Sequence, residues 1–218
     1  MNRETRKAKF LEVDIYPVTC ERLSAGRSNV EVLDAVIDGG ARVIQLREKE
    51  YSGKDLYQLA LQFREITNRA GVLLLINDHL DIAMAVAADG VHLGQDDLPI
   101  AAARKLAPEL LIGASTHSLE EALQAQNDGA DYVNIGPIFP TKTKAGVPYH
   151  LGPDAINAIV SRIRTPFTVM GGINESNIRQ VLAQGARRIA VVTAITQAPD
   201  ISEAVRSLRN CICNYPHA

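Results

Sequence analysis

Cationic and amide side chains gather at residues 45–49, where an apolar run becomes polar. Gln45, Arg47 and Lys49 alternate there, so an extended backbone would place all three on one side. Arginine binds a phosphate through two parallel hydrogen bonds, and lysine adds a compact point charge. The segment therefore favours a phosphate or pyrophosphate site, and a solvated pair of surface cations is the alternative.

Carboxylates follow the next two apolar runs. Asp78 comes after Asn77, and Asp97 comes after Asp96. Carboxylates at the ends of adjacent strands can share a Mg²⁺ ion, which takes one or two of them together with phosphate oxygens. The alternative for Asp97 is to cap a helix that has a proline in its first turn. The two roles could also be divided, with Asp97 as the ligand and Asp96 as the cap.

A hydroxyl and an imidazole follow a further apolar run. Ser115 could hydrogen-bond a substrate, and His117 could be an acid or base or simply a loop histidine. The chain has no Gly-x-Ser-x-Gly motif, so we do not expect a serine nucleophile.

A long polar connection at residues 136–146 contains Thr141, Thr143 and Lys144. Such a loop is typical of a lid over an anionic ligand, and a merely solvated loop is the alternative. Downstream, Gly172 and Thr193 each follow an apolar run, and we expect helices to begin there with backbone N–H groups free to bind phosphate. Two anion pockets result, which suggests a reaction that joins two phosphorylated small molecules.

The elements that would position these residues repeat along the chain. Four times a glycine follows a helical pattern and precedes a β-branched run, as expected where a helix ends in a left-handed residue. The junctions are residues 38–46, 88–94, 128–136 and 184–192. Further strands are expected at 15–18, 73–76, 110–113 and 167–170. Helices are expected at 54–69, 119–126 and 175–183, the last with Asn174 as its N-cap.

Strands that are apolar on both faces indicate a parallel sheet covered by helices. Eight such units predict an α/β fold, a small (β/α)8 TIM barrel, whose active site lies at the C-terminal ends of the strands. A doubly wound open sheet is the alternative, but its dinucleotide-binding fingerprint is missing. We expect one domain over residues 1–218, with a short N-terminal extension at about residues 1–12.

Composition limits the remaining function classes. The net charge of −2 lacks the basic excess of a dedicated nucleic-acid binder. No segment has the length of a signal peptide or a membrane span, so we expect a cytoplasmic protein with no membrane partner. Three cysteines imply no disulfide framework, and Cys211 and Cys213 lack the second pair of ligands that a metal site needs.

Over nearly its whole length the chain resembles the thiamin-phosphate synthase family. The resemblance implies a cytoplasmic transferase that joins hydroxymethylpyrimidine pyrophosphate to a thiazole phosphate, or its carboxylate, with one Mg²⁺ per site. It also implies a dissociative mechanism, in which pyrophosphate leaves and the thiazole nitrogen captures a pyrimidine-methyl cation. The matching motifs are residues 45–49, 76–78, 90–97, 113–118, 136–144 and 171–173.

The resemblance also assigns roles to residues. Asp78 and Asp97 look like the metal ligands. The pyrimidine-pyrophosphate contacts would be Gln45, Arg47, Lys49, Asn77, Ser115 and Lys144, of which Arg47, Lys49, Ser115 and Lys144 would be catalytic. The thiazole-phosphate contacts would be Thr141, Thr143, Gly172, Val192 and Thr193.

The chain departs from the family at a few positions. Thr193 replaces a frequent serine, His79 replaces a common arginine, and Ala145 stands where more polar residues are usual. The competing interpretations are a thiazole tautomerase of the same barrel family and a non-catalytic phosphate-binding module. Neither would need the complete set of cations and metal carboxylates. Homo-oligomerisation is left open.

Overall fold

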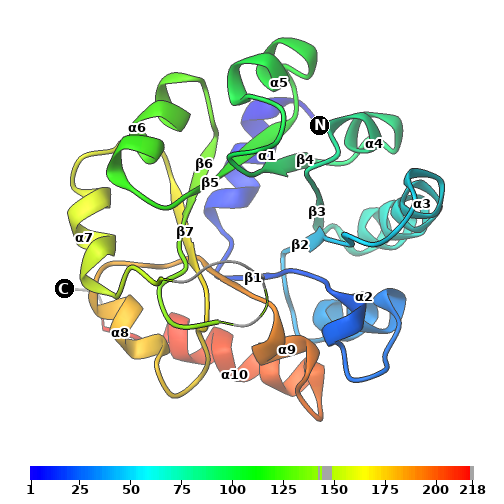
Figure 1. The fold of residues 1–218 in the computed structure, drawn as a ribbon. Helices are drawn as coiled ribbons and strands as arrows, with labels where there is room; N and C mark the ends of the chain where they lie inside the picture. Colours follow the sequence, from blue (N-terminus) through cyan, green and yellow to red (C-terminus); the bar gives the residue numbers. More distant parts are fainter. Residues whose placement is uncertain (142, 144–148, 217–218) are drawn as a thin grey trace.

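The structure, a computed structural model, describes residues 1–141, 143 and 149–216. Eight parallel strands form one sheet in the order β1-β8-β7-β6-β5-β4-β3-β2, and a bridge between Val18 and Gln45 joins its two edges. The sheet therefore curls into a nearly closed barrel (Figure 1), which confirms the predicted fold and makes the open-sheet alternative wrong. The strands are β1 (Ile15–Pro17), β2 (Val43–Leu46), β3 (Leu73–Asn77), β4 (Gly90–Leu93), β5 (Leu111–Thr116), β6 (Tyr132–Ile135), β7 (Phe167–Met170) and β8 (Ile189–Val191).

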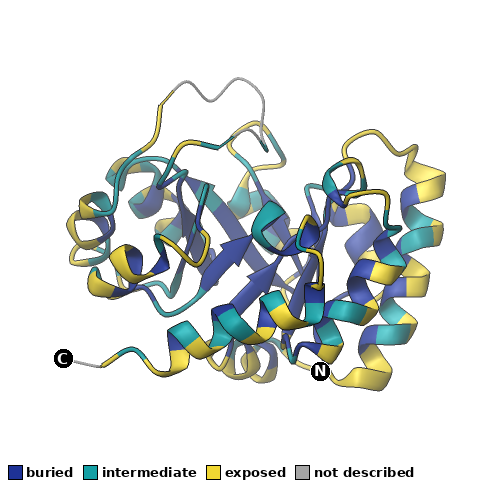
Figure 2. Ribbon diagram, turned by 90° about the horizontal axis from the view of Figure 1, so that it is seen from below, coloured by how far each residue is buried: buried dark blue, intermediate teal, exposed yellow. Residues whose placement is uncertain are grey.

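Helices surround the barrel, with their exposed faces turned away from the buried strands (Figure 2). Within the described residues none of them is long and apolar enough to cross a membrane. They are α1 (Arg3–Leu11), the 3-10 turn η1 (Glu21–Leu23), α2 (Asn29–Asp38), α3 (Gly53–Ala70), α4 (Leu80–Ala85), α5 (Ile100–Leu106), α6 (Leu119–Asn127), α7 (Asp154–Val160), α8 (Ile178–Ala183), α9 (Thr193–Thr196) and α10 (Ile201–Cys213).

The strands bury both faces, and so the protein has two cores. Outward-facing residues such as Leu74 and Val133 pack against the helices. Inward-facing residues such as Leu75 and Tyr132 fill the barrel. Because successive side chains of a strand alternate between these cores, the polar residues near the strand ends are held at fixed positions inside the barrel.

Helix α1 closes the N-terminal end of the barrel, where the ribbon lies across the opening (Figure 1). Arg6 pairs with the buried Asp89 at the start of β4, and Arg3 pairs with the buried Asp131 at the start of β6. Phe10 stacks on Tyr132, with 4.3 Å between the ring centroids. The residues of the predicted extension thus plug one end of the barrel and leave the other end for ligands.

The helix predicted at residues 175–183 begins later, at Ile178, with Asn177 in the N-cap position. Asn174 is therefore not the N-cap, and that prediction was wrong. Its side-chain oxygen instead accepts the backbone N–H of Ser176 at 2.9 Å and forms a local turn. Asparagine favours such turns as strongly as it favours N-caps, and local sequence does not separate the two.

Gly90 also differs from the prediction. Gly40, Gly129 and Gly185 follow their helices with the expected positive φ angles, but Gly90 lies inside β4, and Ala87 is the left-handed residue after α4. A Cβ atom at Gly90 would lie 2.5 Å from the carbonyl oxygen of Leu111. The close approach of β5, rather than the end of a helix, requires glycine there.

Candidate active site

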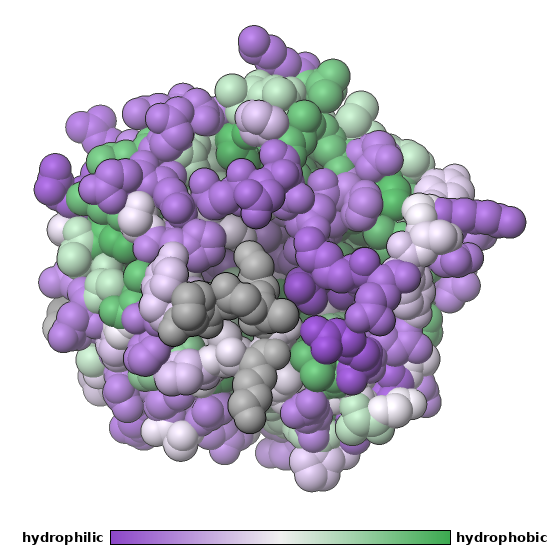
Figure 3. All heavy atoms as spheres, in the orientation of Figure 1, coloured by the Kyte–Doolittle hydropathy of each residue, from purple (hydrophilic) through white to green (hydrophobic). Residues whose placement is uncertain are grey.

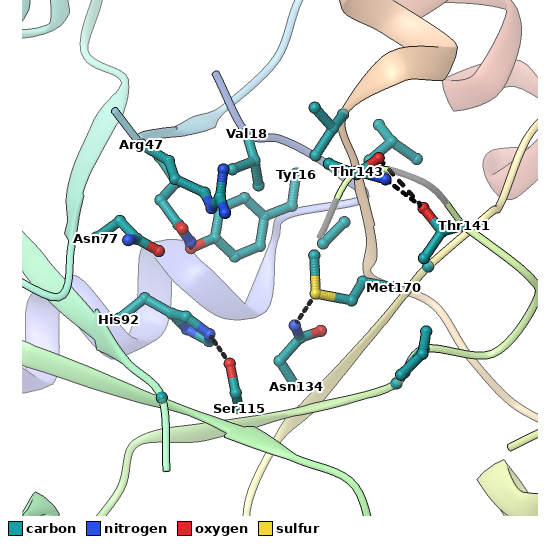
Figure 4. Close-up of a pocket in the computed structure, with 18 of the residues that line it drawn as sticks. Tyr16, Val18, Arg47, Asn77, His92, Ser115, Asn134, Thr141, Thr143 and Met170 are labelled. Atoms are coloured by element: carbon teal, nitrogen blue, oxygen red, sulfur yellow. Dashed lines mark hydrogen bonds between the residues drawn. The ribbon is translucent and has the colours of Figure 1, made fainter. Parts of the chain in front are cut away.

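A pocket of about 240 Å³ lies at the C-terminal ends of the strands (Figure 4). Hydrophilic residues surround the centre of this face of the molecule (Figure 3). The structure brings nearly all of the predicted site residues together in the pocket lining, and Lys144 and Ala145 lie outside the described residues. The predicted residues that line the pocket are Gln45, Arg47, Lys49, Asn77, Asp78, Asp97, Ser115, Thr141, Thr143, Gly172, Val192 and Thr193.

The cationic side of the pocket comes from β2 and the segment after it. Gln45 is buried, Arg47 is half-buried and Lys49 is exposed, and all three line the pocket as their alternation predicted. The backbone N–H of Arg47 donates to the buried Thr19 hydroxyl at 2.9 Å, which holds the end of β2 in place. Lys49 Nζ forms an ion pair with Asp78 Oδ2. Positive charge is thus directed at the carboxylates of the neighbouring strands.

The two predicted metal ligands lie next to each other. Burial raises the pKa of Asp97, and a hydrogen bond with the Asp78 carboxyl raises it further. The backbone N–H of Gly94 donates to Asp97 Oδ2 at 2.6 Å, and the N–H of Asp78 donates to the carbonyl oxygen of His92 at 2.8 Å. Adjacent carboxylates repel each other when both are ionised, and a divalent cation between them removes that cost.

Neither Asp96 nor Asp97 caps helix α5. The helix begins at Ile100, and its N-cap residue is Pro99, without a side-chain cap. The capping alternative for Asp97, and the division that made Asp96 the cap, were therefore wrong. Both carboxylates line the pocket instead. Within the described part of the chain no cluster of three or more His, Cys, Asp or Glu side chains could hold a metal ion. A pair of hard oxygen ligands fits a Mg²⁺ ion that takes its remaining ligands from substrate and water.

The opposite side of the pocket is built from the segments after β6, β7 and β8. Thr141 Oγ1 and Thr143 Oγ1 lie 3.2 Å apart (Figure 4). Gly172 has a φ of +65°, and a Cβ atom there would lie 2.5 Å from the carbonyl oxygen of Pro140. Asn177 Nδ2 donates to the carbonyl oxygen of Gly172 at 2.9 Å, which fixes the turn after β7.

One expectation about this side was wrong and another held. Gly172 does not begin a helix, because α8 starts only at Ile178. Thr193 is the first residue of α9, as expected. Of the two expected helix starts, only that of α9 lies at the pocket; near Gly172 the pocket is lined by a turn and by threonine hydroxyl groups instead.

Several inward-facing pocket residues were missed by the sequence analysis. They are Tyr16, His92, Asn134 and Met170 (Figure 4). Burial lowers the pKa of His92 to about 4, so its imidazole is neutral at pH 7. The signal for His92 and Asn134 was present: each is a polar residue inside an otherwise apolar strand that fills a closed barrel.

Asn134 and His117 have defined partners. The Thr168 hydroxyl donates to Asn134 Oδ1 at 2.7 Å, and Asn134 Nδ2 donates to Met170 Sδ at 2.6 Å. His117 Nδ1 lies 2.9 Å from Glu121 Oε2, and the imidazole also lines the pocket. This contact gives His117 a structural partner on α6 and leaves its acid or base role a prediction.

Comparisons with known proteins show the family to which the chain belongs. The model of a family described as thiamine monophosphate synthase matches residues 15–195. The chain is 48% identical over 202 residues to a thiamine-phosphate synthase of Chloroflexus aurantiacus, covering 93% of this chain and 94% of that protein. It is 46% identical over 213 residues to a thiamine-phosphate synthase of Pelotomaculum thermopropionicum, covering 97% and 98%.

Solved structures give the same picture. A thiamine phosphate pyrophosphorylase from Pyrococcus furiosus superposes with a TM-score of 0.85 at 37% identity, covering 94% of this chain and 96% of that one. A 3-hexulose-6-phosphate synthase superposes with a TM-score of 0.67 at 16% identity, covering 91% and 99%, which is a likeness of fold alone.

Proposed function

The chain belongs to the thiamine monophosphate synthase family, and from this premise we propose how its pocket carries out the reaction. The activity is that of a thiamine-phosphate synthase, a transferase of thiamine biosynthesis that joins a pyrimidine pyrophosphate to a thiazole phosphate. The observation that carries this conclusion is similarity over nearly the full length to synthases. A thiazole tautomerase and a phosphate-binding module are not favoured.

The cationic side of the pocket would hold the pyrimidine pyrophosphate. Arg47 and Lys49 would bind its phosphate oxygens, and Gln45, Asn77 and Ser115 would contact the rest of the molecule. These side chains support the assignment because they converge on one cavity from β2, β3 and β5. Fixed positive charge aimed at a leaving group lowers the barrier for its departure. Lys144, from the segment after β6, would add a further cation.

Asp78 and Asp97 would hold one Mg²⁺ ion. Burial raises the pKa of Asp97, and the neighbouring Asp78 carboxyl raises it further; a cation would offset both effects, which supports this role. When bound, Mg²⁺ would supply charge stabilisation to the departing pyrophosphate. Lys49, which forms an ion pair with Asp78, would bring its positive charge to the same place.

The thiazole phosphate would lie on the opposite side of the pocket. Thr141, Thr143 and Thr193 would donate hydroxyl hydrogens to its phosphate, and the backbone of Gly172 and Val192 would line the same place. The methylene–oxygen bond of the pyrimidine substrate breaks, and pyrophosphate departs with the bonding electrons. The thiazole nitrogen then donates its lone pair to the pyrimidine-methyl cation. This sequence of steps requires no protein base.

The partners are therefore small phosphorylated molecules. We propose further that residues 1–218 form one domain with the extension at about residues 1–12, and that the protein is cytoplasmic.

Purified chain mixed with the two substrates and Mg²⁺ should form thiamin phosphate. Absence of product with well-folded protein would overturn the proposal. Turnover of the thiazole compound alone, without the pyrimidine substrate, would point to the tautomerase.

A further inference from the structure

A network of hydrogen bonds crosses the barrel interior and links Gln45 of β2 to Ser115 of β5. Gln45 Nε2 donates to Tyr16 OH at 2.6 Å, and Tyr16 OH lies 2.9 Å from Tyr132 OH. Tyr132 OH lies 3.0 Å from His92 Nδ1, and His92 Nε2 lies 2.9 Å from Ser115 Oγ. Gln45, Tyr16, Tyr132 and His92 are each at most 5% exposed. Together with Ser115, these four residues form what we call the interior network.

The direction of each bond follows from the number of hydrogens available. Gln45 donates to Tyr16, so the single hydroxyl hydrogen of Tyr16 is satisfied only by donation to Tyr132. Tyr132 then donates its own hydrogen to His92 Nδ1. The opposite direction would leave the Tyr16 hydrogen buried without an acceptor, and an unpaired buried donor is costly.

The same reasoning fixes the direction of the hydrogen bond between His92 and Ser115, at the pocket. A neutral imidazole carries one hydrogen, and because Nδ1 accepts, that hydrogen must lie on Nε2. His92 Nε2 therefore donates to Ser115 Oγ, and the hydroxyl hydrogen of Ser115 is left to point at a ligand. Figure 4 shows the His92–Ser115 bond at the edge of the cavity.

The barrel is built around this network. Gly113, which is paired with His92 in the register of β4 and β5, lies under the Tyr132 ring. A Cβ atom at Gly113 would lie 2.1 Å from Tyr132 Cζ, so any larger residue would displace that ring. Phe10 of α1 stacks on the Tyr132 ring. Gly113 and Phe10 thus hold the ring where Tyr132 makes its two hydrogen bonds.

We propose that Tyr16, Tyr132 and His92 are positioning residues that fix the Ser115 hydroxyl as a hydrogen-bond donor toward the pyrimidine substrate. The inference rests on the proposed function, in which Ser115 contacts that substrate. It adds a specificity rule: the substrate atom that meets Ser115 carries a lone pair, as an aromatic ring nitrogen does, and a C–H or N–H at that place is rejected. A donor fixed before binding loses little rotational freedom when the substrate arrives.

The first test measures directly which ring nitrogen of His92 carries the hydrogen, and it does not depend on enzyme activity. Protein labelled with ¹⁵N at its histidines is examined by long-range ¹H–¹⁵N correlation at neutral pH, and the His92 signals are assigned by their loss in His92→Gln. We expect the Nε2–H tautomer, with Nδ1 unprotonated. An Nδ1–H tautomer, or rapid averaging of the two, would overturn the proposal while leaving the synthase assignment untouched.

The second test asks whether Tyr132 acts through Ser115. Tyr132→Phe removes the donor to His92 Nδ1, and we expect kcat/KM for the pyrimidine substrate to fall about fivefold, the effect of one hydrogen bond. In a Ser115→Ala background the same substitution should have almost no further effect. Equal losses in the two backgrounds would show a general structural role and contradict the proposal.

Phe10→Leu is the matched control, because it disturbs the packing of Tyr132 without removing a hydroxyl group. It should lower kcat/KM less than Tyr132→Phe does, because every hydroxyl group of the network remains, and an equal or larger loss would show that the packing of the ring matters rather than its hydroxyl group. If Tyr132→Phe does not fold, Tyr16→Phe interrupts the network one bond earlier. In that variant His92 Nδ1 is the acceptor that the network leaves to the Tyr132 hydroxyl, so the Nε2–H tautomer should persist, and an Nδ1–H tautomer would contradict the proposed direction.

Discussion

Asp97→Asn is expected to damage activity and improve stability at the same time. The substitution keeps the side-chain shape and an oxygen that can accept the Gly94 N–H bond, now 2.6 Å long. It halves the charge of the proposed ligand pair with Asp78. Charge stabilisation of a leaving group by a metal is worth several kcal/mol, so kcat should fall about 10²- to 10⁴-fold.

The same substitution should raise the free energy of unfolding at pH 7. The pKa of Asp97 is raised in the folded protein by burial and by Asp78. The folded state therefore holds this proton more tightly than the unfolded state, and the resulting stability is present below the unfolded pKa and lost as pH rises through the folded pKa. At pH 7 the ionised Asp97 costs stability, and asparagine removes that cost without removing the hydrogen bond to Gly94.

The assay combines steady-state kinetics with thermal unfolding at pH 7. Mg²⁺ should raise the Tm of the wild-type protein in the presence of pyrophosphate and should hardly change that of Asp97→Asn. Asp96→Asn is the control, since it alters a neighbouring carboxylate of the same pocket, and it should lose little activity. The reasoning is refuted if Asp97→Asn turns over at the wild-type rate, or if it is less stable than wild type at pH 7.

Three further predictions concern other parts of the molecule. Lys144→Ala should lower kcat about 30- to 150-fold in steady-state assays, the effect of a charge-assisted hydrogen bond to the leaving group, and a change in KM alone would show only a ground-state contact. Thr193→Val should raise KM for the thiazole phosphate by about fivefold without changing KM for the pyrimidine substrate, and equal KM values for wild type and variant would place the phosphate elsewhere. Arg6→Ala should destabilise the fold in urea by about 1–3 kcal/mol with kcat unchanged, because the buried Asp89 keeps Arg64 as a partner; an unaltered unfolding midpoint would show that the pair contributes nothing.

The fold and the ends of its strands were predictable because they depend on local patterns. A strand buried on both faces is mostly apolar, so an uninterrupted apolar run such as residues 73–76 can be recognised in the sequence. Polar residues directly after such runs, including Arg47 and Asp78, are brought together by the barrel whatever their distance in sequence. The predicted pocket lining followed from this geometry.

The interior of the barrel was harder to predict because it depends on closure. Tyr16 and Gln45 are neighbours only because the two edges of the sheet meet, and no local pattern shows that contact. His92 and Asn134 stand in apolar strands and resemble core residues until the barrel interior is in view. Gly90 was assigned to a helix end because the approach of β5 is a tertiary contact.

The central claim is that one pocket holds both phosphorylated substrates and joins them. Single turnover with the enzyme in excess over the pyrimidine pyrophosphate, in the presence of Mg²⁺ and thiazole phosphate, tests it most directly. Pyrophosphate and thiamin phosphate are measured in the same quenched samples. The account predicts that the two appear in equal amounts and at the same rate. Pyrophosphate released without thiamin phosphate, or neither compound formed by folded protein, would contradict it.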